Sequence, residues 1–168
     1  KLFLNGLDLK KIAKKKQTPF YIYSADQIIE NVKLAQSSLI KSNPLICYAV
    51  KANSNIEIIK KLKKNNIGAD VVSIGELKLA LKAGVNPKKI VFSGVGKTDE
   101  EIKFAIQKGI LSINAESINE ISVINKIAKK LNKIAQIGIR INPDIKAKTN
   151  KKIATGTKIN KFGVSVNE

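Results

Sequence analysis

The sequence contains few of the features that identify membrane, secreted or nucleotide-binding proteins. Its single cysteine, Cys47, lies in an apolar run, which excludes an internal disulfide and suits a small packing residue and a cytoplasmic location. No apolar stretch is as long as a helix that crosses a bilayer, so we expect no membrane partner. No Gly-x-Gly-x-x-Gly follows the first predicted strand and no P-loop occurs, which disfavours dinucleotide and nucleoside-triphosphate binding.

Acidic residues are scarce as well, because 13 Asp and Glu face 31 Lys and Arg, for a formal net charge of +18. Such a charge is compatible with nucleic-acid binding. However, no aromatic residues interleave with the lysines to stack on bases, and only one arginine, Arg140, is present to read phosphates or base edges. We therefore interpret the lysines as solvated helix faces and expect no nucleic-acid partner. A non-catalytic basic binding protein remains the alternative from another functional class.

Strand-like runs alternate with helix-start signals along most of the chain. Four helix starts show the capping-box pattern, a hydroxyl residue followed three positions later by Glu or Gln. The four hydroxyl residues are Ser24, Ser73, Thr98 and Ser117, and the strand-like runs before them are 20–23, 69–72, 89–92 and 110–114. Further strands are predicted at 45–50 and 134–142, followed by a long polar loop at 144–161. The alternation predicts an α/β fold, either an open doubly wound sheet or a closed (β/α) barrel.

Lys51 is the most informative residue, because it ends the uninterrupted apolar run 45–50. Such a run suits a strand buried on both faces of a parallel sheet. In a barrel, the carboxyl ends of the strands carry the chemistry. A lysine there is a candidate Schiff-base nucleophile, since a desolvated ammonium loses its proton more readily than a solvated one.

Other candidates follow the same strand ends. Asp70 is an acidic residue within an apolar strand, where an unpaired charge is costly, which favours a functional role. Glu76 suits equally a helix cap with Ser73 and the lining of a site. Arg140, the single arginine, indicates a position that needs a planar, bidentate hydrogen-bond donor. The alternative is that it occurs there by chance in a lysine-rich chain. Ser93 and Asn114 have the residue types of ordinary strand-end hydrogen-bonders as well as of a site.

Five segments, in order, resemble motifs of the pyridoxal-phosphate enzymes with an alanine-racemase-like barrel. This fold-type III group includes the diaminopimelate, ornithine and arginine decarboxylases, and the resemblance is greatest to the diaminopimelate decarboxylases. The segments are YAVKAN at 48–53, GADVVSIGEL at 68–77, FSGVGKT at 92–98, INAES at 113–117 and RINPD at 140–144, followed by TG at 155–156 and NKFG at 160–163. The likeness runs from about residue 18 to the end.

The resemblance implies a (β/α)8 TIM barrel of which about five strands are present. Residues 24–168 would form an incomplete cofactor-binding barrel domain, and residues 1–23 would contribute to a second, β domain. Pyridoxal 5'-phosphate would be the cofactor, held by Lys51 and Asp70. The residues that would line the active site are Glu76, Ser93, Asn114 and Arg140.

The resemblance further implies decarboxylation of meso-diaminopimelate to L-lysine and carbon dioxide, in a homodimer with its active site at the interface. An ornithine- or arginine-type decarboxylase, or a racemase, would keep the same lysine. Relatives commonly have a histidine where this chain has Asn150, and the chain has no histidine, so the imidazole that stacks on the cofactor would come from beyond Glu168. With no methionine and a start at Lys1, we expect a piece of a longer protein that is inactive alone.

Overall fold

The structure is a computed structural model that describes residues 2–145 and 162–165. Its contacts divide the chain into two units, Lys1–Pro44 and Leu45–Glu168. The domain boundary predicted from the sequence lies between residues 23 and 24, and it stays a prediction. Within the described residues, no helix is both long and apolar enough to span a membrane.

The first unit contains a short hairpin and two helices. Strands β1 (Phe3–Leu4) and β2 (Leu7–Asp8) pair antiparallel, and helices α1 (Leu9–Ala13) and α2 (Ala25–Ser38) follow. Asn5 and Gly6 form the turn with φ values of 46° and 79°, as a type I′ hairpin turn requires. The strand predicted at 20–23 is wrong: these residues form no strand, and Tyr21 is 91% exposed. An extended run becomes a strand only where a neighbour pairs with it.

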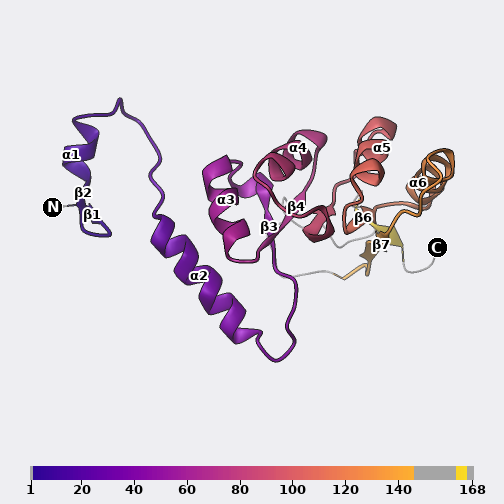
Figure 1. The fold of residues 1–168 in the computed structure, drawn as a ribbon, viewed down its shortest axis with the longest axis horizontal. Helices are drawn as coiled ribbons and strands as arrows, with labels where there is room; N and C mark the ends of the chain where they lie inside the picture. The colour runs from indigo at the N-terminus through magenta and orange to yellow at the C-terminus, as the bar shows by residue number, and fades with distance from the viewer. Residues whose placement is uncertain (1, 146–161, 166–168) are drawn as a thin grey trace. The chain divides into compact units, whose positions relative to one another are not determined.

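The second unit is built on a five-stranded parallel sheet of order β3-β4-β5-β6-β7. The strands are β3 (Cys47–Ala49), β4 (Gly68–Val71), β5 (Ile90–Phe92), β6 (Ser112–Ala115) and β7 (Ile137–Ile139). The helices between them are α3 (Ile56–Lys64), α4 (Ile74–Lys82), α5 (Asp99–Lys108) and α6 (Ile118–Lys130), with 3-10 turns η1 (Val50–Ala52) and η2 (Pro87–Lys89). The predicted alternation of strands and helices is confirmed, and Figure 1 shows α3 to α6 on the same side of the sheet.

Burial alternates along the strands because the helices pack against one face. The side chains at the helix-covered positions are at most 1% exposed; they are Val50, Ala69, Val71, Ile90, Phe92, Ile113 and Ala115. The residues between them are only partly buried. The expectation that 45–50 is a strand buried on both faces is therefore wrong for the described residues. The three residues of β3 are half-buried, and Val50 is the first that is fully buried.

Arg140 divides the predicted strand 134–142 into two. Its N–H donates to the Ala115 carbonyl (2.9 Å), at the end of β6, while its carbonyl accepts from the Val164 N–H (2.7 Å). The chain thus passes from the five-stranded sheet to a second parallel pair, β8 (Ile141–Asn142) and β9 (Val164–Ser165). Gly163 permits this pairing, because a Cβ there would lie 2.8 Å from the Arg140 carbonyl oxygen. Most of the predicted 144–161 loop, including Asn150, lies outside the described residues.

All four predicted N-caps are confirmed, but only one forms a reciprocal capping box. Thr98 accepts from the Glu101 N–H, and the Glu101 carboxylate accepts from the Thr98 N–H. Ser73 and Ser117 also accept from the backbone three residues on. Their partner carboxylates, however, reach one residue farther back, to Val72 N–H and Glu116 N–H. At Ser24, the partner Gln27 donates its side-chain amide to Asn31 instead.

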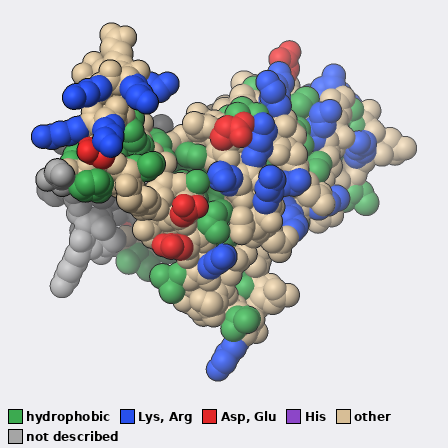
Figure 2. Space-filling view, turned by 60° about the vertical axis from the view of Figure 1, so that its left-hand side comes forward, with side chains coloured by type: hydrophobic (Ala, Val, Ile, Leu, Met, Phe, Trp, Pro, Cys, Tyr) green, Lys and Arg blue, Asp and Glu red, His purple; other side chains and the backbone are tan. Residues whose placement is uncertain are grey.

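Figure 2 shows Lys and Arg side chains scattered among polar and apolar ones over the visible face. On α3, for example, Lys60, Lys61, Lys63 and Lys64 are all exposed. This distribution is the one expected of solvated helix faces.

Candidate active site

Lys51 lies at the carboxyl edge of the sheet, within the 3-10 turn that follows β3. Its neighbour Val50 is fully buried, while Lys51 itself is exposed. The Tyr48 hydroxyl donates to the Asn53 carbonyl at 3.1 Å, and the Asn53 side chain accepts from Asn55 N–H at 3.0 Å. Both bonds hold Asn53, which directly follows the turn that contains the exposed Lys51. The desolvation predicted for Lys51 is not provided by the described residues.

A row of hydrogen-bonded polar side chains crosses three neighbouring strand ends. The Ser93 hydroxyl donates to Asp70 Oδ1 at 2.7 Å, and the Asn114 amide donates to Ser93 Oγ at 3.1 Å. These residues come from β4, from the end of β5 and from β6, on the sheet face opposite the helices. The structure thus brings together three of the sequence-predicted site residues, and we name Asp70, Ser93 and Asn114 the polar row.

Arg140 contacts the carboxylate of Glu116, a residue that was not among the sequence-predicted site residues. Its Nη1 lies 3.2 and 3.3 Å from the two carboxylate oxygens of Glu116, whose side chain is only 4% exposed. The guanidinium also stacks on Phe162, 4.8 Å from the ring centroid. Glu116 further accepts from Gly94 N–H at 3.2 Å. A buried carboxylate requires such partners, so Glu116 and Arg140 hold each other in place.

Lys97 lies in the motif-like segment 92–98, but sequence reasoning did not select it as a site residue. Its side chain is 1% exposed, and its ammonium donates to the Gly94 carbonyl, the Asn114 carbonyl and the Glu120 carboxylate. Nothing in a sequence with 31 basic residues distinguishes a buried lysine from the solvated ones. Its place in the segment 92–98, between a strand end and the N-cap Thr98, is the signal that could have found it.

Glu76 occupies a helix-start position as well as the edge of the site. Its N–H donates to Ser73 Oγ, and its carboxylate accepts from Val72 N–H at 2.9 Å. These bonds explain the residue structurally, and a role in lining the site stays a prediction.

Cys47 lies on the same sheet face as Asp70, one strand away. Burial raises the pKa of its thiol above the ordinary value of 9.0, and the nearby Asp70 charge raises that pKa further. The thiol is therefore protonated at neutral pH, when its nucleophilicity is low.

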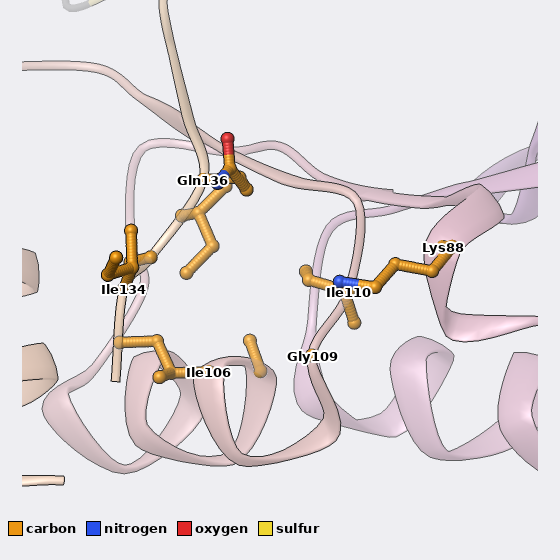
Figure 3. A pocket seen from close by; sticks show the side chains of 9 residues that line it. Lys88, Ile106, Gly109, Ile110, Ile134 and Gln136 are labelled. Carbon is orange, nitrogen blue, oxygen red and sulfur yellow. The ribbon is translucent and has the colours of Figure 1, made fainter. Parts of the chain in front are cut away.

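The opposite edge of the sheet has a pocket of different character (Figure 3). Ile106, Ile110 and Ile134 line it together with Lys88 and Gln136, from segments that precede strands β5, β6 and β7. Its lining contains no acidic residue and no cysteine. Among the described residues, moreover, no group of three His, Cys, Asp or Glu side chains is placed to hold a metal. The carboxyl edge is consequently the better candidate for chemistry.

Comparison with known proteins identifies relatives of this chain. A diaminopimelate decarboxylase of Aquifex aeolicus is 47% identical over 99% of this chain and 39% of its own length. Two crystal structures with L-lysine are similar: a diaminopimelate decarboxylase of Helicobacter pylori (TM-score 0.88, 48% identity, 94% of this chain and 40% of that one) and one of M. jannaschii (0.90, 42%, 98% and 39%). The chain thus spans about 40% of the length of the curated relatives it matches.

The family comparison covers the whole of the second unit and helix α2. Residues 25–168 match the model described as pyridoxal-dependent decarboxylase, pyridoxal binding domain. The relatives that share its parallel sheet are pyridoxal-phosphate enzymes with a TIM-barrel domain. This chain belongs to the family of pyridoxal-dependent decarboxylases, whose pyridoxal binding domain its residues 25–168 match.

Proposed function

We propose that the protein containing this chain decarboxylates meso-diaminopimelate to L-lysine and carbon dioxide with pyridoxal phosphate as cofactor. The observation that carries the proposal is the accessible amine of Lys51, at the same sheet edge as the polar row, in a chain of the pyridoxal-dependent decarboxylase family.

The residues present fit the cofactor. An aldehyde requires an accessible primary amine, and two lysines belong to the loops at this edge among residues 2–145. Lys97 is buried with its ammonium bound to three oxygens, whereas Lys51 is exposed. Lys51 is therefore the residue that would hold the cofactor covalently. The protonated Cys47 thiol does not compete with it for a carbonyl carbon.

When bound, pyridoxal phosphate supplies an electron sink for the bond to the departing carboxylate. The chain's own residues orient the reactants. Asp70 accepts from Ser93 and so has its carboxylate fixed at the strand end, where it can accept a further hydrogen bond from a bound cation or N–H. Arg140 contacts Glu116 through Nη1, and its other nitrogens suit it to bind an anionic group of the substrate or cofactor.

The substrate assignment is supported by identity to the relatives. The relatives named diaminopimelate decarboxylase reach 47–50% identity, and two solved relatives hold L-lysine, the product of such a reaction. A viral arginine decarboxylase shares the fold at 22% identity, which carries no argument about substrate. An ornithine- or arginine-type activity is kept as the alternative, which the substrate assay distinguishes.

A homodimer with its active site at the interface, in the cytoplasm, completes the proposal. Lys51 is exposed in this chain, and the Arg140 side chain is 39% exposed. This exposure supports an interface site, because a reactive amine must be shielded from water during catalysis and a second subunit can provide the shield.

The test is borohydride reduction of the full-length protein incubated with pyridoxal phosphate, followed by peptide mass mapping. We expect a pyridoxyl adduct on Lys51 and none on Lys97, and loss of the adduct in Lys51→Ala. Release of carbon dioxide from meso-diaminopimelate, compared with ornithine and arginine, then identifies the substrate. A folded protein without an adduct at Lys51 would overturn the enzyme proposal, and salt-sensitive retention on nucleic acid would then favour a basic binding protein.

A further inference from the structure

We propose that Lys97 is a positioning residue: with Glu120 it fixes the ends of β5 and β6 and, through Glu116, sets the position of Arg140. The pair Lys97–Glu120 is named the clamp below. The inference rests on the proposed function only for its kinetic readout.

The first step is the saturation of the Lys97 ammonium. A lysine ammonium has three N–H donors. Here they point to the Gly94 carbonyl at 2.6 Å, the Asn114 carbonyl at 2.8 Å and Glu120 Oε1 at 2.8 Å. The side chains of Lys97 and Glu120 are 1% and 12% exposed, so the pair is nearly desolvated. The Lys97 ammonium is held in this position, because moving it would leave a buried charge without its hydrogen-bond partners, at a high cost in free energy.

The second step leads from the clamp to the end of β6. The other oxygen of the Glu120 carboxylate, Oε2, accepts from Glu116 N–H at 2.7 Å. Lys97 meanwhile holds the carbonyl of Asn114, two residues earlier. The clamp therefore restrains the backbone on both sides of Ala115, where β6 ends.

The third step leads to Arg140. The backbone of Glu116 determines where its carboxylate lies, and that carboxylate contacts Arg140 Nη1 and accepts from Gly94 N–H. Gly94 is thus bound on its N–H by Glu116 and on its carbonyl by Lys97, in a backbone conformation with φ of 107° that favours glycine. Loss of the clamp releases this loop, Glu116 and Arg140 together, and with them the Asn114 end of the polar row.

The alternative is that the clamp contributes only to stability. A buried ion pair is weak evidence for stability, because apolar replacements of similar volume are often tolerated. The two readings separate in the kinetics. A purely structural clamp changes the melting temperature, whereas a positioning clamp changes kcat and the cofactor spectrum in protein that is still folded.

The experiment compares three variants of the full-length protein, assayed well below their melting temperatures. Lys97→Met removes the charge and keeps most of the volume, and Glu120→Gln removes the charge of its partner. Lys60→Met is the matched control, because Lys60 and Glu57 form an ion pair of the same 2.8 Å length with side chains 46% and 69% exposed. We expect kcat/KM to fall about 10- to 100-fold in the first two variants, mainly through kcat, and to stay unchanged in the control.

Hydrogen exchange of the cofactor-free protein gives a readout that needs no activity. We expect faster exchange of the amides of Gly94 and Glu116 in Lys97→Met and Glu120→Gln, with unchanged exchange in α3. If Lys97→Met fails to fold, Glu120→Gln carries both readouts. The inference would be overturned if a folded clamp variant showed the same exchange rates at Gly94 and Glu116 as the wild type and a kcat/KM within twofold of the wild-type value. Absence of activity in the wild type would instead refute the proposed function and leave the exchange test intact.

Discussion

Asn114 keeps its place in the polar row because residue 138, opposite it on β7, is a glycine. A Cβ on Gly138 would lie 2.6 Å from Asn114 Oδ1, closer than real Cβ contacts allow. The small residue on one strand is therefore part of the geometry of the polar side chain on the next.

Gly138→Ala should displace the Asn114 side chain and break its hydrogen bond to Ser93. We expect a loss of about 1–3 kcal/mol of stability from overpacking, and a lower kcat in the full-length protein. Chemical unfolding and steady-state kinetics measure the two effects. Gly75→Ala is the control, since its added Cβ would meet only Ser73 Oγ, at 3.7 Å. Equal behaviour of the two variants would contradict this account of Gly138.

Ser93→Ala should remove the centre of the polar row. The hydroxyl both donates to Asp70 and accepts from Asn114, so the substitution leaves two partly buried polar groups without it. We expect about 1–3 kcal/mol of destabilisation and weaker retention of pyridoxal phosphate, measured by unfolding and by cofactor absorbance during dialysis. Ser112→Ala is the comparison, because its hydroxyl lies 3.4 Å from Asn114 Oδ1, a weaker contact. A larger loss of stability or of cofactor retention in Ser112→Ala than in Ser93→Ala would contradict the central position of Ser93 in the polar row.

The sequence predicted local structure well where one residue decides it. The N-caps Ser73, Thr98 and Ser117 were recognisable because the cap is a bond within three residues. The alternation of apolar runs and caps likewise predicted each of the five parallel strands, together with a sixth at 20–23 that does not form. The hairpin at Asn5 and Gly6 also carried a local turn signal, but it was not predicted.

Longer-range relationships were less accessible. The run 20–23 has strand composition but forms no strand, since pairing depends on partners elsewhere in the chain. Asp70, Ser93 and Asn114 were each predicted, but their joining into one row depends on strand register. Lys97 escaped detection because its burial results from three contacts distributed over two loops and a helix.

Cys47 should react slowly with iodoacetamide at neutral pH in the native protein. Burial raises the pKa of its thiol, and the Asp70 charge raises it further, so the thiolate fraction is smaller than for a free cysteine. Alkylation rates measured from pH 7 to 10 should rise only at the alkaline end. In Asp70→Asn the alkylation rate should begin to rise at lower pH, because the charge that helps to raise the thiol pKa is removed. The part of the pKa increase that is due to burial remains. A native rate equal to that of the denatured protein would contradict the burial of the thiol.

Glu101→Gln should destabilise the protein in a pH-dependent way. Desolvation alone would raise the pKa of Glu101, but hydrogen bonds from Thr98 N–H, Ile74 N–H and the Thr98 hydroxyl outweigh it and lower that pKa below 4.5. Because the folded pKa lies below the unfolded one, the carboxylate stabilises the folded state fully above the unfolded pKa. This contribution is lost as the pH falls through the folded pKa.

The difference in melting temperature between wild type and Glu101→Gln should thus be largest near pH 7 and shrink toward pH 3. Glu100→Gln, exposed in the same helical turn, should show little difference at either pH. The carboxylate of Glu101 joins the start of α5 to the start of α4 through Ile74. A melting-temperature difference that does not change with pH would contradict this account. It would mean that the charge of Glu101 does not contribute to holding the two helix starts together, and that Glu101→Gln destabilises the protein only because its amide group cannot accept the same hydrogen bonds.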